Sequence, residues 1–486
     1  MIDIQRKDLL QEGAFIGGQF VAASSQKQFP VYNPYSSAQI ASVADCGATE
    51  AKSAIDLAYT AFQTWKSYTG TERGRILRKW YDLQRAHEKD LAKILTMEQG
   101  KPFREALGEI RYGASFVEWF AEEARRTYGD VIPGHQRDKR IIVLKQPVGV
   151  VAAITPWNFP SAMITRKVAP ALAAGCTVVI KPSELTPLSA LALGVLATEA
   201  GLPPGVLNIL PTNNAPEIGN VMTSSKLVKK LSFTGSTAVG KLLLKQAADS
   251  VKKVSMELGG NAPFIVFNDA DLEKAVAGAV ASKYTNAGQT CVCSNRLFVQ
   301  EGIYEAFIEK FTSAVREQTL GDGMTKGVVI GPMIEEKAVA SVEALVSDAL
   351  EKGARITCGG QRQGVPQSLL YEPTVLADAS TDMAVFRKEI FGPVAPVFKF
   401  DTEEEVIAMA NDTEYGLASY FYGKDHSRIW RVAEALEYGM VGINSPSVST
   451  TVAPFGGVKE SGMGREGSKY GIEEYLVIKQ LMWAVQ

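Results

Sequence analysis

One cysteine stands in a sequence context that can make it a nucleophile. Cys291 lies at a turn, in the stretch Gly288-Gln289-Thr290-Cys291-Val292-Cys293, directly after a segment with helical periodicity. Free backbone N–H groups at such a turn stabilise a thiolate, which is the reactive form of cysteine. An inert, packed cysteine is the alternative for any single thiol. With only three histidines in the chain, neither a zinc ligand set nor a cysteine–histidine pair is predicted.

A carboxylate and an amide could support such a nucleophile. Glu257 stands among apolar residues before Gly259 and Gly260, and burial there would raise its pKa and suit it to act as a general base. An exposed carboxylate in a turn is the alternative. Asn158 follows an apolar run and could donate its side-chain N–H to a developing oxyanion. Its alternative role is an Asx turn or a helix cap before Pro160.

Two glycine- or proline-marked turns could bind a nucleotide. Gly235 and Ser236 separate an expected strand from an expected helix, where N–H groups and the helix dipole can hold a phosphate. Leu242 replaces the hydroxyl residue of a P-loop, which excludes ATP or GTP hydrolysis. Lys181 could bond ribose hydroxyls, and Glu184 would accept from a ribose 2′-hydroxyl and repel a 2′-phosphate, which favours NAD while leaving NADP possible. A plain turn and a solvated ion pair are the alternatives.

The elements that must position these residues follow an α/β pattern. Helical periodicity covers residues 48–65, 73–99 and 105–128, and strands alternate with helices from residue 148 onward. Strands are expected at 148–154, 177–180, 206–210, 231–234, 264–267 and 297–300, with helices at 160–174, 189–200, 239–248, 272–286 and 303–318. Alternation of this kind builds parallel sheets that helices cover on both faces.

Composition limits the class of protein. The 486 residues include 46% hydrophobic and 21% charged residues, carry a formal net charge of −2 and contain five cysteines. These values fit a globular protein of a reducing compartment and predict neither nucleic acid nor a membrane as partner. Without a signal peptide or a run of roughly 18 apolar residues, a cytoplasmic location is expected. The apolar, strand-like segment 474–485 needs a cover, which predicts a homodimer or homotetramer.

Seven motifs, in order along nearly the whole chain, resemble the aldehyde dehydrogenase superfamily. They are Pro156-Trp157-Asn158-Phe159-Pro160, Lys181-Pro182-Ser183-Glu184, Phe233-Thr234-Gly235-Ser236, Glu257-Leu258-Gly259-Gly260, Gly288-Gln289-Thr290-Cys291, Glu389-Ile390-Phe391-Gly392-Pro393 and Pro454-Phe455-Gly456-Gly457. The resemblance implies two doubly wound parallel-sheet domains and a small β oligomerisation arm. Residues 1–129 and 148–257 would form the dinucleotide-binding domain, 258–438 the catalytic domain and 130–147 with 470–486 the arm, while 439–469 would return to the cofactor domain and carry a substrate loop.

The resemblance also implies a division of roles. Cys291 would attack an aldehyde, Asn158 and the Cys291 N–H would hold the oxyanion, and hydride transfer to the nicotinamide would leave a thioester that water, activated by Glu257, hydrolyses. No metal is expected. Cofactor contacts are expected from Thr155, Pro156, Trp157, Lys181, Ser183, Glu184, Gly235, Ser236, Leu258, Glu389 and Phe391, with Glu389 on the nicotinamide ribose and Phe391 beside the nicotinamide. By the same analogy, Cys293 could form a reversible disulfide with Cys291, with a packing role as the alternative.

Within the superfamily the chain is most similar to succinate-semialdehyde dehydrogenases. That similarity implies that Arg166 and Ser449 bind the substrate carboxylate, because a guanidinium suits a carboxylate tail. Thr285 departs from the subfamily, which commonly has a second arginine there, so glutarate semialdehyde or a less polar aldehyde is the alternative substrate. A CoA-acylating enzyme is disfavoured by Glu257, and a non-catalytic structural protein by the presence of Cys291, Glu257 and Asn158.

Overall fold

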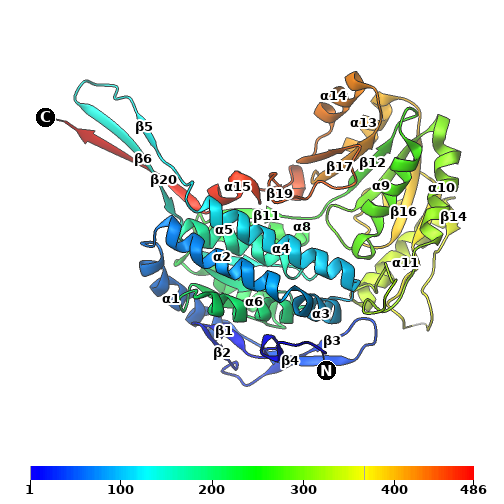
Figure 1. Ribbon diagram of the computed structural model, residues 1–486. Coiled ribbons are helices and arrows are strands. Elements are labelled where there is room, and N and C mark those ends of the chain that lie inside the picture. Colours follow the sequence, from blue (N-terminus) through cyan, green and yellow to red (C-terminus); the bar gives the residue numbers. More distant parts are fainter. Residues whose placement is uncertain (1, 366, 486) are drawn as a thin grey trace.

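The computed structural model describes residues 2–365 and 367–485, which form two sheet-based units and a projecting arm (Figure 1). The first unit contains an 8-stranded sheet of order β19-β11-β10-β7-β8-β9-β1-β2. Its strands are β1 (Ala14–Ile16), β2 (Gln19–Val21), β7 (Val150–Ile154), β8 (Thr177–Lys181), β9 (Leu207–Ile209), β10 (Val228–Thr234), β11 (Lys253–Glu257) and β19 (Gly462–Met463). Its helices are α1 (Ala48–Trp65), α2 (Gly70–Ala86), α3 (Glu88–Gln99), α4 (Phe103–Glu123), α5 (Ala162–Ala174), α6 (Pro187–Ala200), α7 (Ala215–Ser224), α8 (Thr237–Ala248) and α15 (Ser468–Glu473).

The first sheet is parallel at its centre and antiparallel at both edges. Strands β11 to β9 run parallel, as expected from the alternation of strands and helices. β1 instead pairs antiparallel with β9 and β2, and β19 pairs antiparallel with β11. The β1–β2 hairpin turns at Gly17 and Gly18, which both have positive φ, and such a two-residue turn joins only antiparallel strands. The expected parallel sheet is therefore confirmed for the central strands, and antiparallel strands extend it at both edges.

The central strands are apolar on both faces because helices cover both. Val150 and Ala152 of β7 pack in one core with side chains of α1, α7 and α8, whereas Val151 and Ala153 pack in another with α2, α4, α5 and α6. The period of two along a strand sends alternate residues to opposite faces. A continuous apolar run is thus what a sheet enclosed by two helical layers requires.

The second unit is built on a 7-stranded sheet of order β14-β15-β16-β13-β12-β17-β18, with β14 alone antiparallel. Its strands are β12 (Ala262–Val266), β13 (Ser294–Gln300), β14 (Arg355–Cys358), β15 (Thr374–Ala379), β16 (Val394–Phe400), β17 (Ala418–Tyr422) and β18 (Met440–Ile443). Its helices are α9 (Leu272–Tyr284), α10 (Tyr304–Arg316), α11 (Glu336–Glu351), α12 (Ala384–Arg387), α13 (Glu403–Asn411) and α14 (His426–Ala435). One continuous apolar core joins this sheet to its helices.

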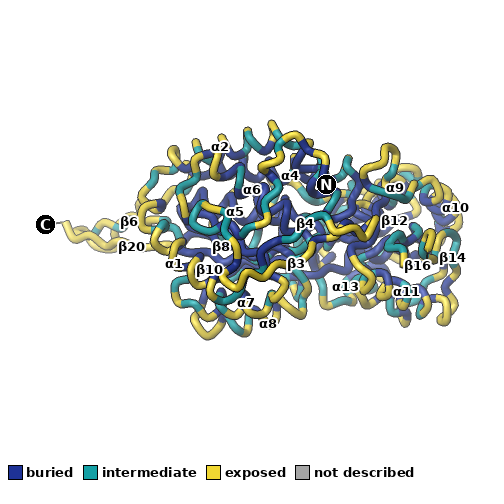
Figure 2. The backbone as a smooth tube through the Cα atoms, turned by 90° about the horizontal axis from the view of Figure 1, so that it is seen from below, coloured by how far each residue is buried: buried dark blue, intermediate teal, exposed yellow. Residues whose placement is uncertain are grey.

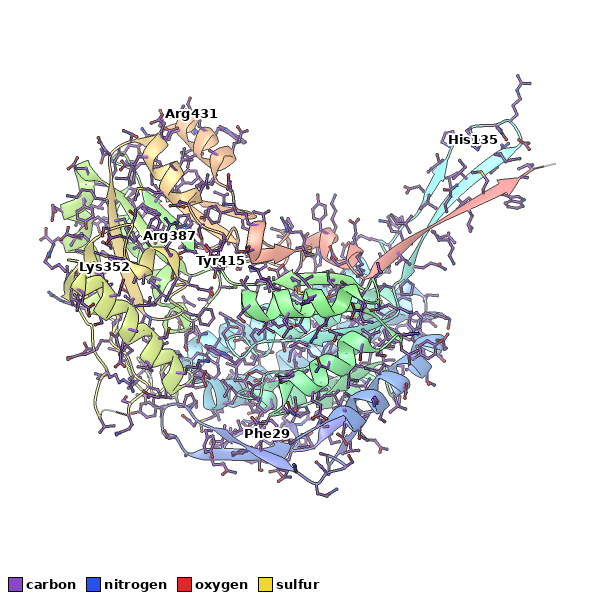
Figure 3. All side chains as sticks on the ribbon, turned by 180° about the vertical axis from the view of Figure 1, so that it is seen from behind. Phe29, His135, Lys352, Arg387, Tyr415 and Arg431 are labelled. Atoms are coloured by element: carbon purple, nitrogen blue, oxygen red, sulfur yellow. The ribbon has the colours of Figure 1, made fainter. Side chains whose placement is uncertain are left out.

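A three-stranded arm stands away from both units. β20 (Leu476–Ala484) pairs antiparallel with β6 (Lys139–Pro147), which also pairs with β5 (Asp130–Ile132). The predicted C-terminal strand is thereby confirmed, and its partner is the segment before residue 148. Figure 3 places His135 at the tip of this arm, and Figure 2 shows the arm largely exposed. Ile478 is 74% and Trp483 66% exposed. A fourth, two-stranded sheet pairs β3 (Gln28–Tyr32) with β4 (Gln39–Ala44).

Three local expectations needed revision. The helical segment expected at 73–99 is two helices that meet at His87, whose ψ of 19° leaves the helical range. The helix expected at 272–286 ends at Tyr284, because Asn286 and Ala287 adopt left-handed φ values. β11 and α7 were not anticipated. Among the described helices, none is both long and apolar enough to cross a bilayer.

Candidate active site

Cys291 opens into a cavity of about 600 Å³ between the two units. The chain leaves α9 through a short 3₁₀ turn (Thr285–Gly288) in which Asn286, Ala287 and Gly288 have φ values of 53°, 55° and 74°. Left-handed backbone is costly for Asn and Ala, and strain of this kind gathers at functional sites. The turn reverses the chain so that the nucleophile precedes β13 and faces the cavity.

The cavity gathers most of the residues singled out in the sequence. Its lining includes Pro156, Trp157, Asn158, Arg166, Gly235, Ser236, Leu258, Cys291, Glu389, Phe391 and Ser449. Thr155, Lys181, Ser183, Glu184, Glu257 and Cys293 lie outside that lining. The residues that line the cavity come from both units, so the site exists only where the two units meet.

Asn158 is held by a buried network that the sequence did not reveal. Its side-chain Nδ2 donates to the Gln289 carbonyl at 3.0 Å, which leaves its second N–H for another acceptor. Its own carbonyl accepts from Lys101 Nζ at 2.7 Å and from Asn286 Nδ2 at 3.0 Å. Lys101 Nζ also lies 2.6 Å from Glu109 Oε2. A buried ion pair therefore fixes the backbone of the residue whose amide faces the nucleophile.

Glu109 connects the same network to α5. Its Oε1 accepts from the backbone N–H groups of Ser161 and Ala162 at 2.9 and 3.2 Å, at the start of that helix. The carboxylate thus caps the helix that carries Arg166. No periodic signal in the sequence separates Lys101 and Glu109 from an ordinary solvated pair, because their burial arises from packing against distant segments.

The Cys291 thiol is desolvated in this structure. Burial, together with the charges of Glu389 and Glu257, raises its pKa to about 12, although the charge of Arg166 opposes them. The lowering expected from turn N–H groups is therefore outweighed by burial. The thiol therefore needs a base to become a nucleophile. Glu389 and Glu257 are the carboxylates close enough for their charge to affect the pKa of the thiol.

Glu257 is a buried carboxylate without a bonding partner. It ends β11, is 3% exposed, and neither side-chain oxygen has a hydrogen-bond partner among residues 2–365 and 367–485. Burial, and then the charge of Glu466, raise its pKa well above the ordinary value of 4.5. An unpaired carboxyl with a raised pKa has, in its ionised form, the properties of a general base.

Glu466 is the second carboxylate of this region, and no role for it was predicted from the sequence. It forms ion pairs with Lys167 and, at 2.6 Å, with Arg166 Nε. Burial works to raise the pKa of Glu466, but the charges of Lys167 and Arg166 outweigh it and hold the pKa below its usual value. Glu466 therefore stays ionised while Glu257 tends to hold its proton.

The wall between Cys291 and Gly235 suits the reactive half of a nicotinamide dinucleotide. Gly235 and Ser236 follow β10, and Ser236 caps α8 by accepting from the Val239 N–H at 3.4 Å. Glu389 is half-buried and lines the cavity. Desolvation raises its pKa to about 7, although its Oε1 accepts from the Gly260 N–H at 2.9 Å. A carboxylate in this lining suits a hydroxyl of a bound ligand. Trp157 and Phe391 stand edge to face 5.6 Å apart.

Gly259 and Gly260 allow the chain that follows Glu257 to pass close to both Cys291 and Glu389. A Cβ on Gly260 would lie 2.3 Å from the Cys291 carbonyl oxygen, and one on Gly259 would lie 2.8 Å from Glu389 Oε2. The contact at Gly260 is with backbone, which cannot move aside, so only glycine fits there. The contact at Gly259 is with the end of the Glu389 side chain, which a larger residue would displace. Gly260 therefore lets the chain after Glu257 pass close to the backbone of Cys291.

Lys181 and Glu184 form an ion pair at 2.9 Å at the end of β8, next to β7 in the sheet. Burial works to raise the pKa of Glu184, but the charge of Lys181 outweighs it and lowers the pKa. Glu184 lines a smaller cavity of about 320 Å³ that Glu98 also lines. Thr155, at the end of β7, is buried with a hydroxyl that has no partner in the described part of the chain.

The other end of the cavity is cationic. Arg166 is 2% exposed, and its guanidinium lies 4.0 Å from the centre of the Phe455 ring. Ser447, Ser449 and Tyr112 line the same end. Thr285 is also in the lining, where its hydroxyl donates to the Ala281 carbonyl at 2.8 Å.

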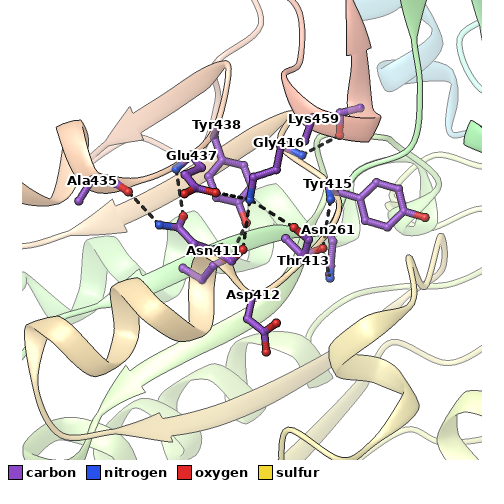
Figure 4. Close-up of polar contacts among 12 residues, drawn as sticks. Asn261, Asn411, Asp412, Thr413, Tyr415, Gly416, Ala435, Glu437, Tyr438 and Lys459 are labelled. Atoms are coloured by element: carbon purple, nitrogen blue, oxygen red, sulfur yellow. Dashed lines mark hydrogen bonds and ion pairs between the residues drawn. The ribbon is translucent and has the colours of Figure 1, made fainter.

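A set of polar contacts, here called the seam, links residues 259–261 with residues 413–416 and 459–461, and Figure 4 draws part of it around Asn261, Thr413 and Lys459. Asn261 Nδ2 donates to Thr413 Oγ1 at 3.3 Å, and Lys459 Nζ donates to the Thr413 carbonyl at 3.2 Å. Ser461 Oγ donates to the Gly259 carbonyl at 2.7 Å and accepts from the Gly416 N–H at 2.9 Å. The seam therefore ties the crossing at 259–261 to both 413–416 and 459–461.

Comparisons with known proteins agree with this geometry. The model of the aldehyde dehydrogenase family matches residues 20–481. The chain is 58% identical over 474 residues to succinate-semialdehyde dehydrogenase (NADP(+)) GabD of Escherichia coli, covering 98% of each chain. It is 56% identical over 484 residues to glutarate-semialdehyde dehydrogenase of Pseudomonas putida, covering 99% of this chain and 100% of that protein.

A solved structure, an aldehyde dehydrogenase from Brucella melitensis biovar abortus, superposes with a TM-score of 0.99 at 56% identity, and each chain is covered completely. The resemblance and the fold expected from the sequence are both confirmed. The chain belongs to the aldehyde dehydrogenase family.

Proposed function

We propose that this aldehyde dehydrogenase oxidises an ω-carboxy aldehyde, and first of all succinate semialdehyde, to the dicarboxylate with NAD(P). The observation that carries the proposal is the placement of Arg166 in the same cavity as Cys291. A guanidinium there binds a carboxylate tail while the aldehyde carbon reaches the sulfur. The named activities of the relatives support the same substrate class.

The chain supplies each step around the thiol. Glu257 takes the Cys291 proton, the sulfur adds to the aldehyde carbon, and Asn158 Nδ2 with the Cys291 N–H holds the oxyanion. NAD(P)⁺, when bound, would supply the acceptor for the hydride that leaves this adduct. Glu257 then removes a proton from water, which attacks the thioester and releases the carboxylate and the thiolate. The presence of this base favours water over CoA as the acyl acceptor.

The dinucleotide is assigned to the first unit. We place it on residues 1–129 and 148–257, with the catalytic residues on 258–438 and the substrate loop in 439–469. Gly235 and Ser236 would hold the pyrophosphate and Lys181 the adenosine ribose. Further contacts would come from Thr155, Pro156, Trp157, Ser183 and Leu258.

NAD is proposed as the preferred cofactor because an ionised Glu184 repels a 2′-phosphate. The NADP named for the Escherichia coli relative argues the other way, so the preference has to be measured. In a Glu184→Ser variant, the kcat/KM with NADP divided by the kcat/KM with NAD should rise about 10-fold. This is the effect of removing one charge repulsion of roughly 1.4 kcal/mol. An unchanged ratio refutes this role of Glu184.

Assembly, location and regulation are proposed from simpler features. The exposed apolar residues Ile478 and Trp483 on β20 support a homodimer or homotetramer in which the arm, 130–147 and 470–486, contacts a second copy. We propose a cytoplasmic location from the cysteine usage. Cys293 remains a candidate for a reversible disulfide with Cys291, and its thiol is buried in this structure.

A panel of aldehydes tests the function. Succinate semialdehyde, glutarate semialdehyde, butanal and pentanal should be compared by kcat/KM with both cofactors. The four-carbon ω-carboxy aldehyde is expected to exceed butanal by about 10- to 150-fold, the range of one hydrogen bond to a charged group. Glutarate semialdehyde is the second candidate, because Thr285 leaves the tail end with less positive charge. Equal values for carboxy and neutral aldehydes refute the proposal.

A further inference from the structure

A phenol stands beside the cationic end of the cavity, and the protein does not satisfy its hydroxyl. Tyr112 lies on α4 and lines the cavity together with Arg166 and Ser449. Its hydroxyl is inaccessible to solvent. Ser449 lies near enough to affect the phenol, but no described residue forms a hydrogen bond of good geometry with it. A buried hydroxyl in this state is costly, so a ligand that accepts a hydrogen bond from it is the expected explanation.

The ring is fixed in place by contacts shared with Arg166. Tyr112 meets Phe116 edge to face at 4.9 Å, and the Arg166 guanidinium lies 5.4 Å from the same Phe116 ring. One turn along α4, the Ser115 hydroxyl hydrogen-bonds the Thr451 hydroxyl at 2.6 Å, which ties the helix to the loop that carries Ser449. The phenol, the guanidinium and the loop serine are therefore positioned together.

One edge of the Arg166 guanidinium is occupied by a protein carboxylate. Its Nε lies 2.6 Å from Glu466 Oε2 as an ion pair, and its Nη1 lies 3.8 Å from the Met163 sulfur. Neither Nε nor Nη2 has a hydrogen-bond partner in the part of the chain that the structure describes. Because Glu466 lies at Nε, a tail cannot bind side-on across Nε and Nη2, and Nη2 is the group left to meet it. A second donor beside Nη2 would satisfy the other oxygen of a tail carboxylate.

The Thr285 hydroxyl cannot be that donor, because it already donates a hydrogen bond to the Ala281 carbonyl at 2.8 Å. The Tyr112 hydroxyl is free to be the donor. Burial raises the pKa of the phenol, although the charge of Arg166 opposes this, so the group remains a neutral donor at physiological pH. A neutral donor adds a bond to an anionic tail without adding a second charge to a buried site.

We propose that Tyr112 is a specificity-determining residue whose hydroxyl donates to the anionic tail of the substrate, so that one cation and one phenol together form the tail clamp. Ser449 is the third donor at this end. The inference rests on the proposed function, because it requires a substrate with an anionic tail. It assigns discrimination between carboxy and neutral aldehydes to two helices, α4 and α5, of the first unit.

A Tyr112→Phe variant removes the hydroxyl and keeps the ring against Phe116. We expect kcat/KM for succinate semialdehyde to fall about 10- to 150-fold, the range for a hydrogen bond to a charged group, mainly through KM because the tail bond is present before and during the reaction. Butanal has no tail to bind, so its kcat/KM should change by less than about 2-fold. The ratio between the two substrates is a readout that a purely structural role would not move.

Tyr371→Phe is the matched control. The Tyr371 hydroxyl is equally buried and unpartnered among the described residues, yet it does not line the cavity. This variant should leave the substrate ratio unchanged.

The outcomes separate the inference from the function on which it rests. If the wild-type protein shows no preference for the carboxy aldehyde over butanal, the proposed function itself fails. If the wild-type preference is present but Tyr112→Phe retains it, or loses activity on both substrates alike, the role of Tyr112 is overturned while the function stands.

Discussion

Replacing Glu257 by glutamine should separate the two halves of the reaction. Neither oxygen of Glu257 has a hydrogen-bond partner within residues 2–365 and 367–485, so the substitution breaks no bond in the protein and removes a group that is costly to ionise. The fold is therefore expected to survive. Glutamine cannot accept a proton, and loss of a positioned general base typically costs about 10²- to 10⁴-fold in rate.

The assay is rapid mixing of the variant with aldehyde and oxidised cofactor, followed by absorbance of the reduced cofactor. Hydrolysis of the thioester depends on the base, so turnover should slow by the factor above. Once the adduct has formed, acyl-enzyme should accumulate on Cys291 and be visible by mass spectrometry of the intact protein. Chemical quenching at successive times separates slow thiol addition from slow hydrolysis.

Two results would refute the reasoning. Steady-state turnover within about 3-fold of wild type would show that another group activates water. Full loss of turnover without any acyl-enzyme, even after prolonged incubation, would show that Glu257 serves thiol activation alone. A Glu98→Gln variant, which alters a buried carboxylate outside the cavity, is the control for general effects of burial.

The same residue predicts a pH dependence with a defined sign. The pKa of Glu257 is raised well above 4.5, chiefly by burial, so the carboxyl is protonated at pH values where an exposed glutamate is already ionised. Only the ionised form accepts a proton from water. Hydrolysis should therefore rise with pH through that raised pKa, and Glu257→Gln should lose this limb of the profile.

Three further predictions address neighbouring residues. Asn158→Ala should lower kcat about 10²- to 10³-fold by removing an oxyanion donor, and an unchanged kcat in steady-state assays would exclude that role. Thr285→Arg should raise kcat/KM for succinate semialdehyde by roughly 10-fold but not for butanal, because it adds a second cation to the tail site; equal changes for both would contradict this. Lys101→Met should destabilise the fold by about 3–5 kcal/mol by leaving Glu109 buried and unpaired. Thermal unfolding should show a larger loss than for the exposed Lys79→Met, and equal losses would count against a structural role for the pair.

The sequence predicted the residues proposed to act on the substrate better than the residues that position them. Helix α1 has the bounds expected, because Ala51, Ala54, Ile55 and Ala58 repeat with the helical period and form its buried face. The family and the fold, inferred from motifs, are confirmed, and Asn158, Arg166 and Cys291 share one cavity.

The supporting residues could not be found in the same way. Lys101 and Glu109 lie in a stretch rich in charges, and Tyr112 has the spacing of an ordinary helical core residue. Their burial depends on segments more than 50 residues away, including Asn158 and Arg166. A local sequence pattern shows which residues share one face of a helix. It does not show which distant segment covers that face.

The placement of the cavity between two sheets has a consequence for chain length. Arg166 belongs to α5 on the first sheet, whereas Cys291 precedes β13 on the second. A substrate that reaches from Arg166 to Cys291 must match the distance between two units that pack separately. Under the proposed function, altering contacts that join the two units, such as the hydrogen bond from Ser461 to the Gly259 carbonyl, should change the preferred chain length of the aldehyde without changing any atom that touches the substrate.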